Sequence, residues 1–164
     1  MSEKHIRDGL IDQIAAKLDT IQRKNAYDRD VARVYTTAPN GANIPSPAIV
    51  VTQGDEDVEE FVGPIAQRNC LLNITFVDNY AGRDQDGEAL EFLADVQRAL
   101  GSMLSFQYSA RRADGGATLV SQNAQLFEQG SSLNYADSMR GKIYGTVSYV
   151  LQYRTSSKDP RRLP

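Results

Sequence analysis

Residues able to perform acid–base or nucleophilic chemistry are few in this chain of 164 residues. It has one histidine, His5, and one cysteine, Cys70. A Ser-His-Asp triad needs a histidine to move its proton, and a zinc site needs several His or Cys ligands, so both kinds of site are disfavoured. Cys70 falls on the apolar positions of a predicted strand, which favours a buried structural thiol over a nucleophile. Without a second cysteine the chain cannot form an internal disulfide, and a reducing compartment fits best.

Four carboxylates lie close together in the middle of the chain and could hold a hard cation such as calcium. They are Asp78, Asp84, Asp86 and Glu88. If Gly87 were the glycine of an EF-hand loop, the first and twelfth ligand positions would be Gly82 and Leu93, and neither has a side-chain oxygen. The spacing therefore favours a solvated loop that caps a helix, and we expect no metal and no cofactor.

A second acidic run has five carboxylates within six residues: Asp55, Glu56, Asp57, Glu59 and Glu60. Acid–base catalysis would require one of them to be desolvated, and no apolar pocket is implied by the neighbouring residues. The run predicts a solvent-exposed loop, and its charge suits a surface that faces a lumen or a protein partner.

The basic residues suggest binding rather than catalysis. Arg111 and Arg112 precede Gly115 and Gly116, but a phosphate loop would need a helix after the glycines, and a strand is predicted there instead. Near the C-terminus, Asp159 is the one acid among four cations, which are Arg154, Lys158, Arg161 and Arg162. Residues 154–164 thus have a net charge of +3. Because the whole chain has a net charge of −3, residues 1–153 have a net charge of −6. A basic tail of this kind can dock on a neighbouring subunit, and it would bind nucleic acid only weakly.

The elements that must position these residues follow from the apolar periodicity. Apolar residues spaced by three and four predict helices over 6–21 and 86–100, with Ser2 as a cap of the first and Asp84 or Asp86 as a cap of the second. Alternating or compact apolar runs predict five strands, at 29–37, 48–52, 69–78, 118–128 and 142–154, the first two forming a hairpin.

This order of elements predicts an α+β fold, a five-stranded, mainly antiparallel sheet with two helices packed on one face. We expect one domain over residues 1–153 and a flexible basic tail over 154–164, because the tail offers almost no apolar side chains. No apolar run approaches the roughly 18 residues that a membrane span needs, and no secretory signal is evident, so we expect no membrane association.

Five segments, in their order along nearly the whole chain, resemble a phage tail-terminator protein. They are IRDGLIDQIAAKL at residues 6–18, PAIVVTQGDE at 47–56, LLNITFV at 71–77, LEFLADVQRAL at 90–100, and VSYVLQYRT followed by DP at 147–160. The similarity lies in pattern and order, and no single motif is diagnostic.

The resemblance implies a structural virion protein and no enzyme. Such a subunit assembles in the host cytoplasm into a hexameric ring on the last ring of the tail tube, at the head–tail junction. The ring stops tube polymerisation and offers a docking surface to the head-connector or neck protein and, in contractile tails, to the sheath. DNA passes through the lumen without specific binding. The expected interface residues are the acidic run at 55–60, Arg111 and Arg112, and the four cations of the basic tail.

Three alternatives remain open at this stage. A related neck or tail-completion protein would show the same pattern. A small nucleic-acid-binding α+β module would need a basic surface with exposed aromatic residues, and the body of this chain is acidic. A small enzyme is the weakest alternative, because the chain has no histidine pair, cysteine motif or phosphate loop.

Overall fold

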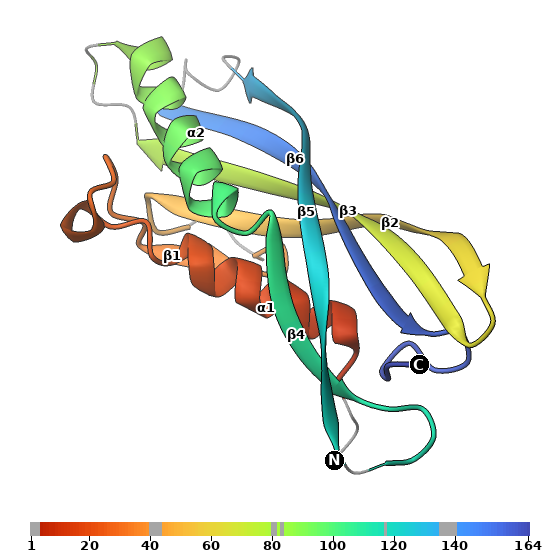
Figure 1. The fold of residues 1–164 in the computed structure, drawn as a ribbon. Helices are drawn as coiled ribbons and strands as arrows, with labels where there is room; N and C mark the ends of the chain where they lie inside the picture. Colours follow the sequence, from red (N-terminus) through yellow and green to blue (C-terminus); the bar gives the residue numbers. More distant parts are fainter. Residues whose placement is uncertain (1–3, 40–43, 80–81, 83, 117, 135–140) are drawn as a thin grey trace.

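The computed structural model describes residues 4–39, 44–79, 82, 84–116, 118–134 and 141–164, apart from the side chains of residues 60–62 and 134. Two α-helices, a short 3-10 helix and six strands follow one another along the chain (Figure 1). They are α1 (Ile6–Leu18), η1 (Arg23–Asn25), β1 (Arg33–Tyr35), β2 (Ala48–Val62), β3 (Ile65–Asn79), α2 (Gln85–Gly101), β4 (Ser105–Arg111), β5 (Leu119–Asn134) and β6 (Lys142–Ser156).

The predicted amphipathic helices are present, with small differences at their ends. The apolar stripe of α1 is buried as expected, but the helix ends at Leu18, and Ile21 is buried beyond it. His5 caps α1 by accepting a hydrogen bond from the amide of Arg7 at 3.3 Å, while the predicted cap, Ser2, lies outside the described residues. Asp84 caps α2 as predicted, because its carboxylate accepts from the amide of Gly87 at 3.0 Å.

One mixed sheet joins all six strands in the order β1-β2-β3-β6-β5-β4. The α+β class is confirmed, but the sheet has one strand more than predicted. The additional strand is β4, in which Phe106, Tyr108 and Ala110 alternate with polar residues. This run is short and half polar, so its period-two signal is weak.

The first two strands do not form a hairpin. β1 is parallel to β2, and Val34 pairs with Ile49. The connection between them contains Pro39, Pro45 and Pro47, which cannot donate ladder hydrogen bonds, so a tight antiparallel turn has no support there. The hairpin partner of β2 is β3, which pairs with it out to Val62 and Ile65 across Gly63 and Pro64. Gly63 has a φ of 62°, a value that glycine adopts without strain.

The sheet curls around α1. This helix contacts β1 and β2 at one edge of the sheet and β4 at the other, so both edges approach the same helix. α2 packs on β6 and on α1, and the ring centroids of Phe92 in α2 and Phe76 in β3 lie 4.7 Å apart. Both helices therefore cover one face of the sheet, as predicted (Figure 1). Cys70 is fully buried in this core, and its burial raises the pKa of the thiol.

The C-terminal segment lies against the body of the protein, unlike the free tail expected from its composition. β6 continues to Ser156, and Thr155 and Ser156 are both buried. Residues 157–164 then turn back, and Leu163, 1% exposed, enters the core beside the end of β4. The reason is this leucine together with backbone pairing: its amide donates to the Arg111 carbonyl and its carbonyl accepts from the Ala113 amide, both at 2.8 Å.

Candidate interaction surfaces

The acidic run at residues 55–60 is part of a strand and not a loop, which corrects the expectation from sequence. These residues belong to the second half of β2, where Asp57 pairs with Asn69 and Glu60 with Gln67 of β3. Two register shifts, between Gln53 and Glu56 and between Val58 and Glu60, interrupt the ladder. Charged side chains and bulges are common on strands at the edge of a sheet, where one side faces water.

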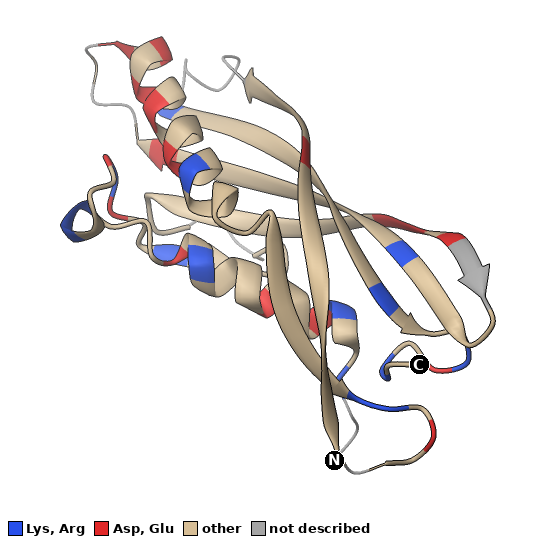
Figure 2. Ribbon diagram, in the orientation of Figure 1, with Lys and Arg blue, Asp and Glu red and all other residues tan. Residues whose placement is uncertain are grey.

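The second half of β2 is such an edge. β1 pairs only with Ala48–Val50, and within the described ranges no strand pairs with the other side of residues 51–62. We call residues 51–62 the β2 edge. Asp55, Asp57 and Glu59 are exposed on it, and Figure 2 shows the acidic stretch leading toward the hairpin turn. The side chain of Glu60 lies outside the described residues.

Glu56 differs from the three exposed acids of the run, because its side chain is turned to the interior. It accepts hydrogen bonds from Tyr153 and, at 2.7 Å, from Arg68, and Arg7 of α1 lies 3.5 Å away. Burial acts to raise the pKa of this carboxyl, but the hydrogen bonds from Tyr153 and Arg68 outweigh it and leave the pKa below its usual value. Burial and the nearby Glu56 carboxylate raise the pKa of Tyr153. Glu56 is thus occupied within the fold, and we remove it from the predicted interface.

Two basic segments far apart in sequence meet at one end of the molecule. The turn after β4 carries Arg111 and Arg112, and it pairs with the C-terminal segment through the bridge between Arg112 and Leu163. Arg112 also donates to the Pro164 carbonyl at 3.3 Å. Residues 111–116 and 157–164, which we call the basic end, hold five cations and two acids. Within it, Asp159 lies 3.0 Å from Arg161 and 3.5 Å from Arg162, and the hydrogen bonds from the Arg161 amide and guanidinium lower its pKa.

Arg154 does not belong to the basic end. Its side chain is exposed on β6, where it pairs in register with Gln67, and only its backbone meets Tyr108 of β4. It lines a shallow hollow of about 250 Å³ whose other polar groups are mostly amides: Gln67, Gln122, Asn123, Gln125 and Gln152. The four predicted tail cations are therefore divided between two surfaces.

A larger groove, of about 460 Å³, lies between the start of α1 and β4. Leu119, 64% exposed, contributes apolar surface to it, and the buried Ile6 and Leu10 also line it. Lys4, Arg111 and Arg161 contribute positive charge. No aspartate or glutamate lines it among the described residues. Lys4 forms an ion pair with Asp12, and Arg161 with Asp159, so part of this charge is balanced nearby.

The face of the sheet turned away from the helices is uncharged along the middle of its central strands, β3 and β6. Asn73, Thr75, Thr146 and Ser148 form hydrogen-bonded pairs across β3 and β6, at 2.7 Å for Ser148 with Asn73 and 3.0 Å for the two threonines. On the same face Val150 pairs with two exposed apolar residues, Leu71 of β3 and Phe127 of β5. This face offers phosphate no cation over residues 69–77 and 144–152.

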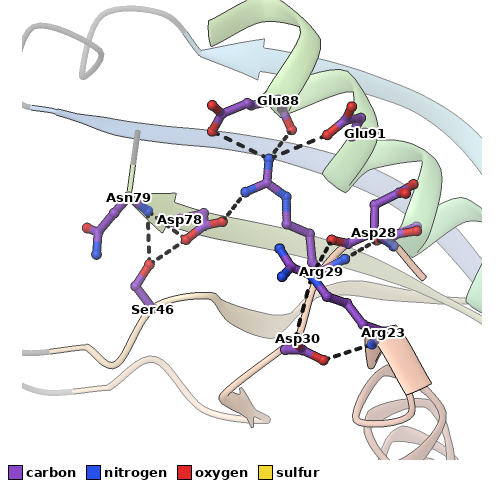
Figure 3. A network of polar contacts seen from close by, with 10 residues as sticks. Arg23, Asp28, Arg29, Asp30, Ser46, Asp78, Asn79, Glu88 and Glu91 are labelled. Carbon is purple, nitrogen blue, oxygen red and sulfur yellow. Dashed lines mark hydrogen bonds and ion pairs between the residues drawn. The ribbon is translucent and has the colours of Figure 1, made fainter. Parts of the chain in front are cut away.

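Three of the four carboxylates considered for a cation site contact protein groups, two of them around Arg29 (Figure 3), and Asp86 is exposed. Arg29 lies 2.6 Å from Asp78, donates to the Glu88 carbonyl at 3.0 Å, and forms longer ion pairs with Glu88 and Glu91. Asp78 also accepts from Ser46 at 2.8 Å. Asp84 is used as the helix cap, and in the part of the chain that the structure describes no three His, Cys, Asp or Glu side chains are placed to hold a metal.

Asp95 of α2 adds a further contact between this helix and the segment before β1. Its carboxylate accepts from the amides of Asp28 and Arg29, at 2.9 and 3.0 Å, and it is almost fully buried. Burial raises the pKa of Asp95, although the two amides act in the opposite direction. Sequence reasoning missed Arg29 and Asp95, since an isolated charge gives no sign of its partner far along the chain.

Comparison of the chain with family models and with curated proteins found no match. Neither described helix has the length and apolar character to cross a membrane.

Proposed function

We propose that this chain is a structural subunit of a phage tail that closes the end of the tail tube as a ring, in the manner of a tail terminator. The proposal is that the ring is hexameric, stops tube growth and presents a docking surface to the head-connector or neck protein. It places the protein in the virion, at the head–tail junction, after assembly in the host cytoplasm. DNA would pass through the lumen without specific binding, and a sheath protein would be a further neighbour in a contractile tail.

The observation that supports this best is the long unpaired β2 edge with its exposed carboxylates. An exposed edge presents a row of backbone donors and acceptors that another chain can use, and the charges limit which chain that is. A ring subunit needs such directional contacts. A nucleic-acid-binding module would need cations along its binding face, and it is disfavoured by the acidic edge and by the lack of cations over residues 69–77 and 144–152 of the outer face.

Electron microscopy of tail tubes tests the proposal directly. The purified chain is mixed with tubes assembled from phage tail-tube protein, and tube ends are scored for six-fold caps and for arrested growth. Capped ends with arrested growth support the proposal. Tubes that keep growing with bare ends contradict it, and binding to connector rings alone would identify a neck protein instead.

The basic end has its own test in the same assay. Neutralising Lys158, Arg161 and Arg162 to Gln should lower the fraction of capped ends if these cations dock on a neighbour. The matched control neutralises Lys24, Arg33 and Lys142, which are exposed and lie elsewhere. Equal capping by both variants would remove the basic end from the docking surface and leave the cap itself in place.

A further inference from the structure

Among the described residues, the sheet has on each side an edge with which no strand pairs over most of its length. On one side is the β2 edge, residues 51–62, which β1 leaves unpaired. On the other side is β4, the last strand in the order, which the C-terminal segment touches only at its end, through the Arg111 carbonyl. Over Ser105–Ala110 no described strand lies beyond β4.

The two edges have opposite charge. The β2 edge has five acids and no cation in its sequence, and three of the acids are exposed. β4 has no acid, and it ends at Arg111, which Arg112 follows. Two β2 edges facing each other would bring like charges together, which is destabilising in cross-strand pairs. The charges therefore favour contact between unlike edges and oppose a symmetric contact of two β2 edges.

Beside β4 there is room for the side chains of an added strand. The 460 Å³ groove runs between this strand and the start of α1, and it combines apolar walls with Lys4, Arg111 and Arg161. The β2 edge offers a matching set of side chains, since Val58, 37% exposed, lies between Asp57 and Glu59. Strand addition of this kind uses backbone hydrogen bonds for affinity and alternate side chains for specificity.

We propose that the β2 edge of one copy pairs with the β4 edge of the next copy, so that the sheet continues from subunit to subunit. The contact uses a different surface on each partner, and a contact of this type repeated by rotation closes a ring. The inference rests on the proposed function only for the size of the ring and for its place on the tube. The edge pairing itself concerns two copies of this chain alone.

Charge exchange between the edges tests the pairing. One variant carries Asp55→Lys, Asp57→Lys and Glu59→Lys, so both of its edges are positive. A second variant carries Lys4→Glu, Arg111→Glu and Arg112→Glu, so both of its edges are negative. Each is followed by sedimentation velocity and light scattering up to about 0.5 mM chain, a range that detects even weak contacts. Circular dichroism and thermal unfolding establish that each variant is folded.

We expect the unchanged chain to form multimers, each variant alone to remain monomeric, and an equimolar mixture to form multimers that contain both variants in equal number. A control with the same charge change at exposed sites, Asp19→Lys, Asp28→Lys and Asp86→Lys, should assemble as the unchanged chain does. Folded variants that stay monomeric when mixed would overturn the pairing, as would an unchanged chain that is monomeric throughout. A mixture that stops at dimers would show contact between two like strands instead.

The outcome is separable from the proposed function. Multimers that require opposite edges but leave tube ends bare would retain the pairing and reject the tube cap. If each variant alone caps tubes as well as the mixture does, the tube-capping function stands and the edge pairing is rejected.

Discussion

Gly145 occupies a place in β6 where no side chain fits. A Cβ atom there would lie 2.6 Å from the Phe76 ring, 2.8 Å from Leu133 and 2.9 Å from the Ser132 carbonyl. Because one of these neighbours is backbone, the strands must shift to admit it. We expect Gly145→Ala to lower the free energy of unfolding by about 1–3 kcal/mol, measured by urea denaturation. Gly130→Ala on β5 is the matched control, since nothing lies within 4 Å of its added carbon. Equal stability of the two variants would contradict the close packing.

Glu56 should make the stability of the protein depend on pH. Its pKa in the folded protein lies below the usual value of 4.5, so its ionised form stabilises the fold above that pH, and this contribution disappears as the pH falls through the folded pKa. We expect Glu56→Gln to cost about 1–3 kcal/mol at neutral pH, because Arg68 and Tyr153 lose a charged partner. The difference from the unchanged chain should shrink below pH 4.5.

Urea unfolding at several pH values measures this difference. Glu59→Gln serves as the control, because the side chain of Glu59 is exposed on the same strand. A cost for Glu56→Gln that stays constant from neutral pH into the acid range would contradict the role assigned to the ionised carboxylate.

Among the elements, the C-terminal segment is attached by one buried side chain, that of Leu163, together with backbone hydrogen bonds. Leu163→Ala removes its buried apolar group, and Leu→Ala changes in cores cost about 2–5 kcal/mol. We expect the segment to detach, so that the amides of Ala113 and Leu163 lose their protection in hydrogen exchange. Leu104→Ala is the control because Leu104 is 62% exposed. Unchanged protection of both amides in Leu163→Ala would contradict this attachment.

Sequence periodicity was sufficient to predict the elements that have a clear apolar face. It failed for strands that are defined by their pairing with neighbouring strands. The stripes of α1 and α2, the cap at Asp84 and the alternation of β3 and β6 all follow from local spacing. The acidic half of β2 was wrongly assigned to a loop, because edge strands tolerate charge that a buried strand would exclude. The short, half-polar β4 was missed for want of a strong alternation.

The candidate surfaces were harder to predict than the fold. Their charges are visible in the sequence, but their grouping is set by long-range contacts. Leu163 beside Arg112 brings the two halves of the basic end together, while Arg68 and Tyr153 withdraw Glu56 from the acidic edge. No local pattern reports a contact such as that of Tyr153 with Glu56, which lie 97 residues apart in the chain.

At the scale of the whole molecule, self-association through opposite edges should depend on salt. Exposed charges attract over a Debye length of about 10 Å at 0.1 M ionic strength and about 3 Å at 1 M. We expect the multimer fraction of the unchanged chain to fall steeply between these two salt concentrations, measured by light scattering at one protein concentration. A fraction that rises with salt would indicate that an apolar surface, such as that around Leu71 and Phe127, drives association instead.

The ladder between β3 and β6 gives the molecule a mechanical property. Fifteen consecutive residue pairs, from Ile65 with Ser156 to Asn79 with Lys142, join the two strands without a register shift. If β3 and β6 were pulled in opposite directions along their length, the force would act in shear on all the backbone hydrogen bonds between them. The bonds would share the force and would not break one at a time. A protein with this strand pair at its centre would resist extension along the direction of β3 and β6.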